Sequence, residues 1–299
     1  MTELHKFIFD GLPVRGMVVR LTDAWVEILR RRAANPETGP YPPEVQNLLG
    51  EMTAAAVMMQ ANLKFNGALI LQIFGDGPLK LAVVEVQADL AFRATAKVHG
   101  ELPAGARLSD MVNLHNQARC AITLDPAERK PGQQPYQGVV PLSRRVFGAP
   151  EDRIEHMAEV LEHYMLQREQ LDTTLVLAAN STVAAGLLLQ RMPMQGLGNL
   201  SGTTERSNED DIGKNEDYQR LALLAKSLTA EELLTLGVDT VLHRLFWQEK
   251  LLRFAPGSGE TAPRFACSCS LERVTSMLKS LGQAEADSII AERGKIDVG

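Results

Sequence analysis

Apolar residues follow strand and helix patterns up to about residue 194, and beyond that point the pattern stops. Residues 195–220 instead contain four glycines, and six acidic residues outnumber three basic ones. A segment of this composition buries too little apolar surface to fold by itself. The 299 residues exceed one ordinary domain of roughly 100–200 residues. We therefore expect a core over 1–194, an acidic flexible linker with helices over 195–262, and a small C-terminal module over 263–299.

The core part combines strand signals with separate helix signals. Apolar residues at helical spacing predict helices at 22–32, 44–63 and 151–170, the first of them capped by Thr22 and Asp23. Strands are expected at 7–9, 14–21, 69–74, 79–86, 90–98, 120–124, 138–142, 175–179 and 184–191. The last two runs are rich in Ala and Leu, which leaves helix open there. Strands clustered apart from helices predict an α+β fold.

Helical signals return inside the linker part. Leucines recur at helical spacing, and Thr229 followed by Glu232 predicts a capping box at a helix start. These leucines are Leu221, Leu224, Leu228, Leu233 and Leu234. A further helix is expected over 238–246, and the Pro-Gly-Ser-Gly run at 256–259 marks a second break. Two short helices are expected in the C-terminal module, near 272–281 and 284–292.

The charge and composition argue against two classes of partner. With a net charge of −6, the protein lacks the positive electrostatic field that attracts nucleic acid or anionic lipid. Only 5% of its residues are aromatic, so few side chains are available for stacking on bases. The longest apolar stretch, 175–189, is interrupted at 180–182 and is too short to span a bilayer as a helix. The first residues lack a secretory signal, and three cysteines do not form a disulfide framework. We therefore expect a cytoplasmic protein without nucleic-acid or membrane partners.

The strongest local signal is the pair Cys267 and Cys269, separated by one serine. Residues i and i+2 project to the same side of an extended segment, so the two thiolates can meet one soft cation. The pair is open to interpretation as a metal chelate, a redox pair or a coincidence. A structural zinc site needs four ligands, and neither Cys nor His follows Cys269. The apolar, strand-like end at 296–299 leads us to expect the other half of such a site beyond it.

Other candidate sites have simpler interpretations. Strand alternation predicts that Cys120 is a buried core thiol. His156 and His163 share a helix face with several glutamates, which is more typical of a solvated surface than of a metal site. The glycines at 196–202 do not have the spacing of a phosphate-binding loop. Because neither a nucleophile elbow nor an acid/base pair of carboxylates is recognisable, nothing in the sequence supports an enzyme.

Several segments, taken in order, resemble the 33-kilodalton heat-shock chaperone family, which consists of redox-regulated holdases. Each short segment is a weak signal alone, but the ordered set covers nearly the whole chain and is specific. The segments are PVRG at 13–16, LKFNG at 63–67, GDGPL at 75–79, GLLLQRMP at 186–193, EELLTL at 231–236, RLF at 244–246 and FACSCSLER at 265–273.

The resemblance implies a role for the two neighbouring cysteines. Family members carry C-x-C, then about thirty residues, then C-x-x-C, and the four thiolates bind zinc in the reduced state. Cys267 and Cys269 match the first pair and are therefore candidate zinc ligands and redox-active cysteines. The family spacing places the second pair just past Gly299, so we expect a module that is incomplete here and zinc that belongs to the full-length reduced form.

The resemblance further implies a chaperone without catalytic turnover. Oxidation of the thiolates to disulfides under oxidative stress would release the metal and unfold the small module. The linker would then loosen and expose apolar surface on the core and on the five leucines, which would hold unfolding client proteins. Active family members form homodimers. In a chain without the second cysteine pair, we expect the client surface to be available even without oxidant.

The sequence leaves two alternatives to the holdase function open. An α+β enzyme with an unrecognised active site would require a pocket with convergent polar groups and perturbed pKa values. A zinc module that contacts nucleic acid or the ribosome would require a basic patch, against which the net charge argues.

Overall fold

The computed structural model describes residues 2–128, 134–144, 152–192, 215–257, 259–266 and 275. The chain divides into two compact units, residues 1–265 and 266–299. Only Ala266 and Thr275 of the second unit are described, so the fold is established for the first unit. The short helices expected near 272–281 and 284–292 fall, apart from Thr275, outside the described residues.

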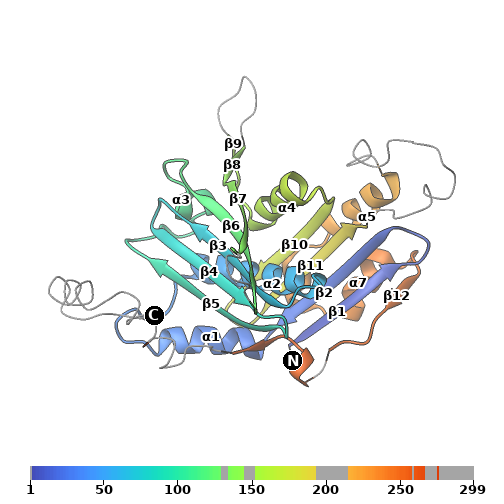
Figure 1. Cartoon of the computed structure of the whole chain (residues 1–299), viewed down its shortest axis with the longest axis horizontal. Helices are drawn as coiled ribbons and strands as arrows, with labels where there is room; N and C mark the ends of the chain where they lie inside the picture. Colours follow the sequence, from blue (N-terminus) through green and yellow to red (C-terminus); the bar gives the residue numbers. More distant parts are fainter. Residues whose placement is uncertain are drawn as a thin grey trace. The chain divides into compact units, whose positions relative to one another are not determined.

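Strands and helices are mixed along the chain, and the predicted α+β class is confirmed (Figure 1). The helices are α1 (Asp23–Ala33), α2 (Pro43–Asn62), α3 (Leu108–Val112), α4 (Met157–Glu169), α5 (Glu216–Lys226), α6 (Ala230–Thr235) and α7 (Val238–Phe246). The strands are β1 (Glu3–Phe9), β2 (Val14–Leu21), β3 (Gly67–Phe74), β4 (Leu79–Val86), β5 (Ala91–Val98), β6 (Arg119–Pro126), β7 (Tyr136–Pro141), β8 (Ser143–Arg144), β9 (Asp152–Arg153), β10 (Thr173–Ala179), β11 (Ala184–Arg191), β12 (Leu251–Arg253) and β13 (Arg264–Phe265).

The strands form two main sheets. One has five strands in the order β10-β11-β2-β1-β12, and the other has six in the order β13-β5-β4-β3-β6-β7. All pairs are antiparallel except β13 with β5, where Arg264 lies opposite Ala91. The short strands β8 and β9 pair separately. Each main sheet is therefore closed along one edge by a short strand that arrives late in the chain.

Helix α2 contacts strands of both main sheets and forms the centre of the core. Thirteen of its twenty residues are buried, which explains why its apolar residues are not confined to one stripe. Small side chains allow close packing: a Cβ added at Gly50 would collide with the Cβ of Ala179. Within the described part of the chain, α2 and the other helices are too short or too polar to cross a membrane.

Most predicted elements are confirmed, and the differences have local causes. The strands at 14–21 and 79–86, the helix at 238–246 and the hairpin of β10 and β11 occur as expected. Helix α4 begins at Met157 instead of residue 151, because residues 152–153 pair with β8 and the backbone N–H of Ile154 donates to Leu142. Thr22 occupies the N-cap position of α1, but its side chain makes no capping hydrogen bond.

Residue Glu51, on helix α2, carries a testable consequence of burial. Desolvation raises the pKa of Glu51 to about 8. A carboxyl group whose pKa is higher in the folded state than in the unfolded state costs stability as pH rises from roughly 4.3 towards the folded value. Glu51→Gln removes this cost, so we expect the variant to be more stable than wild type by about 3.5 kcal/mol at pH 7 and nearly equal at pH 4.

Urea unfolding at the two pH values measures this difference in the free energy of unfolding. Glu44→Gln on the same helix is the matched control, for which we expect the opposite change in the free energy of unfolding. The Glu44 carboxylate accepts a hydrogen bond from the backbone N–H of Gly105 at 2.7 Å, and that bond lowers the pKa of Glu44. This variant should lose stability at pH 7. A gain for Glu51→Gln that does not change with pH would contradict the prediction.

Candidate functional site

The five-stranded sheet is buried on both faces. On β2 and β11, Met17, Val19 and Leu188 face helix α2, whereas Val18 and Leu187 point to the opposite side. We call this opposite side the apolar outer face. Its buried residues are Phe7, Phe9, Val14, Val18, Ala178, Ala185, Leu187 and Leu189.

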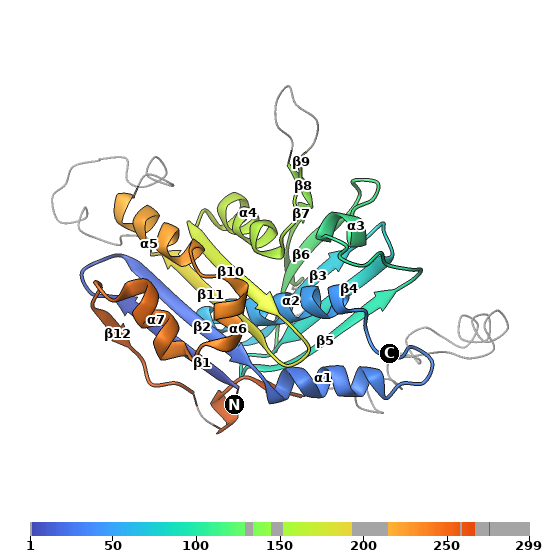
Figure 2. The same ribbon diagram turned by 180° about the vertical axis from the view of Figure 1, so that it is seen from behind.

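Helices α5, α6 and α7 lie across the apolar outer face, and we call them the helical cover (Figure 2). Together with the outer face they form a hydrophobic cluster distinct from the main core around α2. The helical cover contributes buried residues to this cluster, and so does Leu228, which lies between α5 and α6. These residues are Tyr218, Leu221, Ala225, Leu228, Leu233, Val238, Val241, Leu242, Leu245 and Phe246. The molecule thus has an apolar sheet face whose shielding depends on three late helices.

Aromatic rings form the centre of this contact. The ring of Phe246 from α7 meets Phe9 edge to face with centroids 5.1 Å apart, and lies 6.3 Å from the ring of Phe7. The Phe7 ring in turn covers Gly16 on β2, where an added Cβ would collide with it. Pairs of this geometry contribute beyond their buried area. The three rings therefore add an aromatic contact between α7 and the sheet to the burial of the other apolar residues of α7.

The helices of the cover are short. They contain 11, 6 and 9 residues, fewer than the roughly 12–15 that an isolated helix needs to be even marginally stable in water. Two local caps assist them: Asn215 accepts a hydrogen bond from the N–H of Tyr218, and Thr229 and Glu232 form the predicted capping box. These caps do not replace packing, so the cover depends on the sheet for its helical state.

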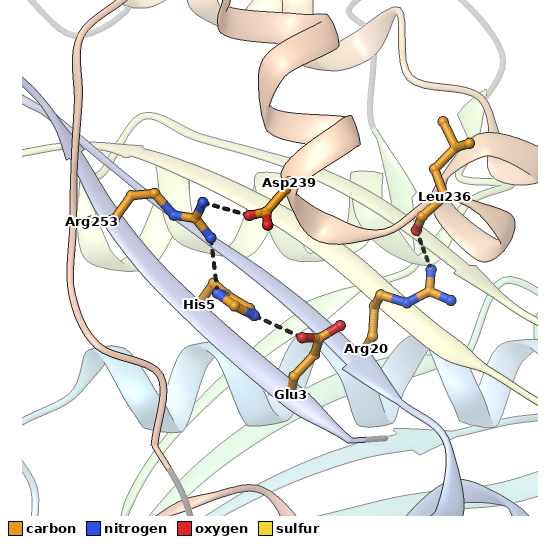
Figure 3. A network of polar contacts seen from close by, with 6 residues as sticks. All are labelled: Glu3, His5, Arg20, Leu236, Asp239 and Arg253. Atoms are coloured by element: carbon orange, nitrogen blue, oxygen red, sulfur yellow. Dashed lines mark hydrogen bonds and ion pairs between the residues drawn. The ribbon is translucent and has the colours of Figure 1, made fainter.

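Arg20 anchors the cover to the sheet (Figure 3). Its guanidinium group extends from β2 and donates to three backbone carbonyls around the end of α6: Leu233 at 2.7 Å, Leu236 at 2.9 Å and Leu234 at 3.0 Å. Carbonyls at a helix C-terminus lack partners within the helix, and a cation is favoured there by the helix dipole. One side chain of the sheet therefore satisfies the end of α6.

A chain of polar contacts also joins β1, β12 and α7 (Figure 3). Arg253 donates to Asp239 at 2.5 Å and to Nδ1 of His5 at 3.1 Å, and Nε2 of His5 donates to Glu3 at 2.9 Å. The hydrogen bond from Arg253 lowers the pKa of Asp239. Because Asp239 is exposed, the pair orients α7 more than it stabilises it.

A buried hydrogen bond also joins α5 of the helical cover to β10 of the sheet. The hydroxyl groups of Tyr218 on α5 and Thr174 on β10 lie 2.8 Å apart. Burial raises the pKa of Tyr218, so the phenol stays protonated. Helix α5 begins at Glu216, inside the segment that was expected to be linker.

The five leucines predicted to contact clients all belong to the buried interface of the cover. Leu221, Leu228 and Leu233 are buried, and Leu224 and Leu234 are partly buried against the same cluster. The large apolar side chains that are exposed on this region were missed by the sequence analysis: Leu223, Trp247, Leu252 and Phe254. Leu223 is 72% exposed and Trp247 67%. Helical spacing could have flagged Leu223, since it lies off the face formed by residues 221, 225 and 228.

The cysteines fall into two groups. Cys267 and Cys269 lie outside the described residues. Cys120 is fully buried on β6, as predicted, and desolvation raises its pKa to about 12, which makes its thiol unreactive. Among the described residues, no group of three or more His, Cys, Asp or Glu side chains is arranged to hold a metal ion. His156 and His163 therefore belong to no such group. The thiols at 267 and 269 suit zinc in kind but supply only half of a tetrahedral set.

Comparison with known proteins finds a matching family and relatives that are similar over nearly the whole chain. The family model described as "Hsp33 protein" matches residues 2–299. The 33 kDa chaperonin of Chromobacterium violaceum is 42% identical over 296 residues, which cover 99% of this chain and 86% of the relative. That of Methylobacillus flagellatus is 38% identical over 297 residues, covering 99% and 87%.

A solved structure shares the fold. The crystal structure of a 33 kDa chaperonin (heat shock protein 33 homolog) from Thermotoga maritima superimposes with a TM-score of 0.66 at 18% identity, covering 97% of this chain and 89% of that one. The sheets and helices described here are therefore a shared architecture. With a family model that matches nearly every residue, this chain belongs to the Hsp33 family of chaperones.

Proposed function

We propose that this protein is a redox-regulated holdase, which binds unfolding client proteins through the apolar outer face once the helical cover has left it. Membership of a chaperone family, which is not a class of enzymes, supports a role in binding unfolded proteins. The observation that carries the proposal is the separate hydrophobic cluster between the outer face and three short helices. Those helices stand in the sequence between the core and the C-x-C pair.

The proposed trigger is oxidation of Cys267 and Cys269. With a peroxide as oxidant, two thiols lose two electrons and two protons to form a disulfide, and hydrogen peroxide is reduced to two water molecules. Cys267 and Cys269 are also the residues we assign as two zinc ligands. Zinc, when bound, would fasten the small C-terminal module, which is too short to fold on hydrophobic burial alone.

Release of the cover would follow from the weakness of its helices. Without the sheet, α5, α6 and α7 fall below the length at which helices persist in water. Their undocking would uncover Phe7, Phe9, Val18, Leu187 and Leu189 together. A contiguous apolar patch of this kind binds exposed apolar segments of other proteins without requiring a particular sequence.

Two further parts of the proposal concern the setting of the protein. A switch based on free thiols requires a reducing compartment at rest, so we place the protein in the cytoplasm. We also propose that the active form is a homodimer, because a released cover could exchange between two copies. Sedimentation velocity at increasing protein concentration tests the dimer, and a monomer throughout would exclude it.

Suppression of client aggregation, measured by light scattering, tests the function. We expect peroxide treatment to increase suppression by wild type and to leave the Cys267→Ser/Cys269→Ser variant unchanged. Cys120→Ala is the control, because that thiol is buried and should not respond to peroxide. Suppression by the reduced wild type measures how much of the outer face is available without oxidant. If peroxide has the same effect on wild type and on the double variant, the redox proposal fails; if neither ever suppresses aggregation, the holdase proposal fails.

A further inference from the structure

A small cavity lies between the two main sheets, near the C-terminal end of α2 and on the side of the five-stranded sheet away from the cover. Its volume is about 90 Å³. It is lined by Arg15, Met59, Asn62, Leu63, Leu69, Ile122, Leu124, Tyr136, Tyr164, Met165, Glu169, Leu171, Leu188 and Gln190. The proposed holdase function makes no use of this cavity.

One end of the cavity has more hydrogen-bond donors than acceptors. The side-chain oxygen of Gln190 accepts from Nε of Arg15 at 3.1 Å, from Nη2 of Arg15 at 2.5 Å and from Asn62 at 2.8 Å. An amide oxygen has two lone pairs, so three donors compete for it. Gln190 is buried and is held in place by a hydrogen bond that it donates to Thr173. The site therefore offers donors that a second acceptor could engage.

The same end carries uncompensated positive charge. Among the ion pairs of the described residues, none involves Arg15, whose partner is the neutral amide of Gln190. Lys6 on the neighbouring strand donates to the backbone carbonyl of Ala61 at 2.5 Å. Burial and the charge of Arg15 lower the pKa of Lys6, and burial lowers the pKa of Arg15. Lys6 lies outside the lining of the cavity, so Arg15 is the cation that a ligand would meet, and a partly desolvated guanidinium paired only with a neutral amide favours an anion.

The remaining walls are mainly apolar. Leu69, Ile122 and Leu188 form the buried part, whereas Leu63 and Tyr136 are exposed near the opening. The one acidic residue among the described residues of the lining, Glu169, accepts hydrogen bonds from the hydroxyl groups of Tyr136 at 3.3 Å and Tyr164 at 3.2 Å. Glu169 is thus engaged by the two phenols, and its charge disfavours an anion beside it, which leaves Arg15 as the place for a carboxylate.

We propose that this cavity binds a small monocarboxylate with an apolar body, whose carboxylate meets Arg15 and Asn62 and whose body lies among Leu69, Ile122 and Leu188. The volume limits the ligand to roughly six to ten non-hydrogen atoms, as in a short-chain fatty acid. Three of the segments that carry the family resemblance contribute to the lining: Arg15 from PVRG, Leu63 from LKFNG, and Leu188 and Gln190 from GLLLQRMP.

The test compares hexanoate with hexanamide, which has nearly the same shape but lacks the charge. Isothermal titration calorimetry of the wild-type 299-residue chain should show hexanoate binding at least tenfold more tightly than hexanamide. Equal binding of the two compounds, or binding of neither up to their solubility limits, overturns the proposal. This comparison needs no variant and so does not depend on whether a substitution folds.

Three variants then locate the site. Arg15→Met should weaken hexanoate binding at least tenfold and leave hexanamide unchanged, whereas Leu124→Phe, which fills the cavity, should weaken both. Arg119→Met removes an exposed arginine from β6 and is the matched control, expected to bind like wild type. Hexanoate binding that is weakened equally by Arg15→Met and Arg119→Met would reflect only general charge attraction and would overturn the assignment.

Discussion

Replacing Arg20 with methionine is expected to release the helical cover from the sheet in the reduced protein. The substitution removes the three charge-assisted hydrogen bonds that Arg20 donates to the carbonyls of Leu233, Leu234 and Leu236. Allowing for water that replaces part of them, the loss is on the order of 3 kcal/mol. The population of molecules with an undocked cover should rise about a hundredfold.

Hydrogen exchange of backbone amides in α5, α6 and α7 measures that population, because exchange there should accelerate while β3 and β4 stay protected. Client aggregation assays of the reduced variant should show more suppression than wild type. Arg244→Met is the control: Arg244 pairs with Glu232 of α6 at 2.9 Å but lies at the surface, so its removal should change little. Exchange in the cover that is equal in Arg20→Met and wild type would contradict the anchoring role of Arg20.

Phe246→Ala should have the largest effect of any single substitution in the cover. The Phe246 side chain is almost fully buried and packs against both Phe7 and Phe9. Truncation of a buried phenylalanine to alanine typically costs about 3–5 kcal/mol, and most of that loss should fall on docking of α7. Limited proteolysis under reducing conditions should therefore cut within residues 216–246 well before it cuts the two main sheets.

The adjacent residue provides a matched control. Trp247 is 67% exposed, so Trp247→Ala removes a larger ring from the same end of α7 without loss of buried contacts. Its effect on stability should stay within about 0.5 kcal/mol. If the two variants are cut at the same rate, or if Phe246→Ala exposes the whole chain at once, the cover is not a separately releasable layer.

The sequence predicted the sheets better than it predicted the layer that covers one of them. Alternation and turn residues located β2, β3 and β4, because these signals are local. Strand β11 is buried along nearly its whole length, so its Leu187-Leu188-Leu189 run shows no alternation. That unbroken run was the available sign that both faces of the sheet are covered. The predicted start of α4 was wrong because residues 152–153 pair with residues 143–144, and this strand pairing overrode the helical pattern.

The candidate site was only partly within reach of sequence reasoning. The leucines of α5 and α6 were identified, but nothing local says that Leu221 and Leu233 are buried in the cluster with the apolar outer face rather than exposed to solvent. The role of Arg20 depends on a contact across more than 200 residues of sequence, and the cavity beside Arg15 draws its walls from elements scattered over the core. Cys267 and Cys269 were identified from their spacing alone, whereas their role as zinc ligands and redox-active cysteines comes from the family resemblance and is tested by the peroxide experiment.

The segment that follows the helical cover in the sequence provides an edge strand to each of the two main sheets. Residues 251–253 pair with β1, and residues 264–265 pair with β5, where Arg31 stacks on the Phe265 ring at 4.6 Å. If this stretch departs with the cover, β1 and β5 become open strand edges with unpaired N–H and C=O groups. A misfolding polypeptide could then bind through main-chain hydrogen bonds as well as through apolar contacts. Main-chain hydrogen bonds do not depend on side chains, so such an edge can bind polypeptides of unrelated sequence.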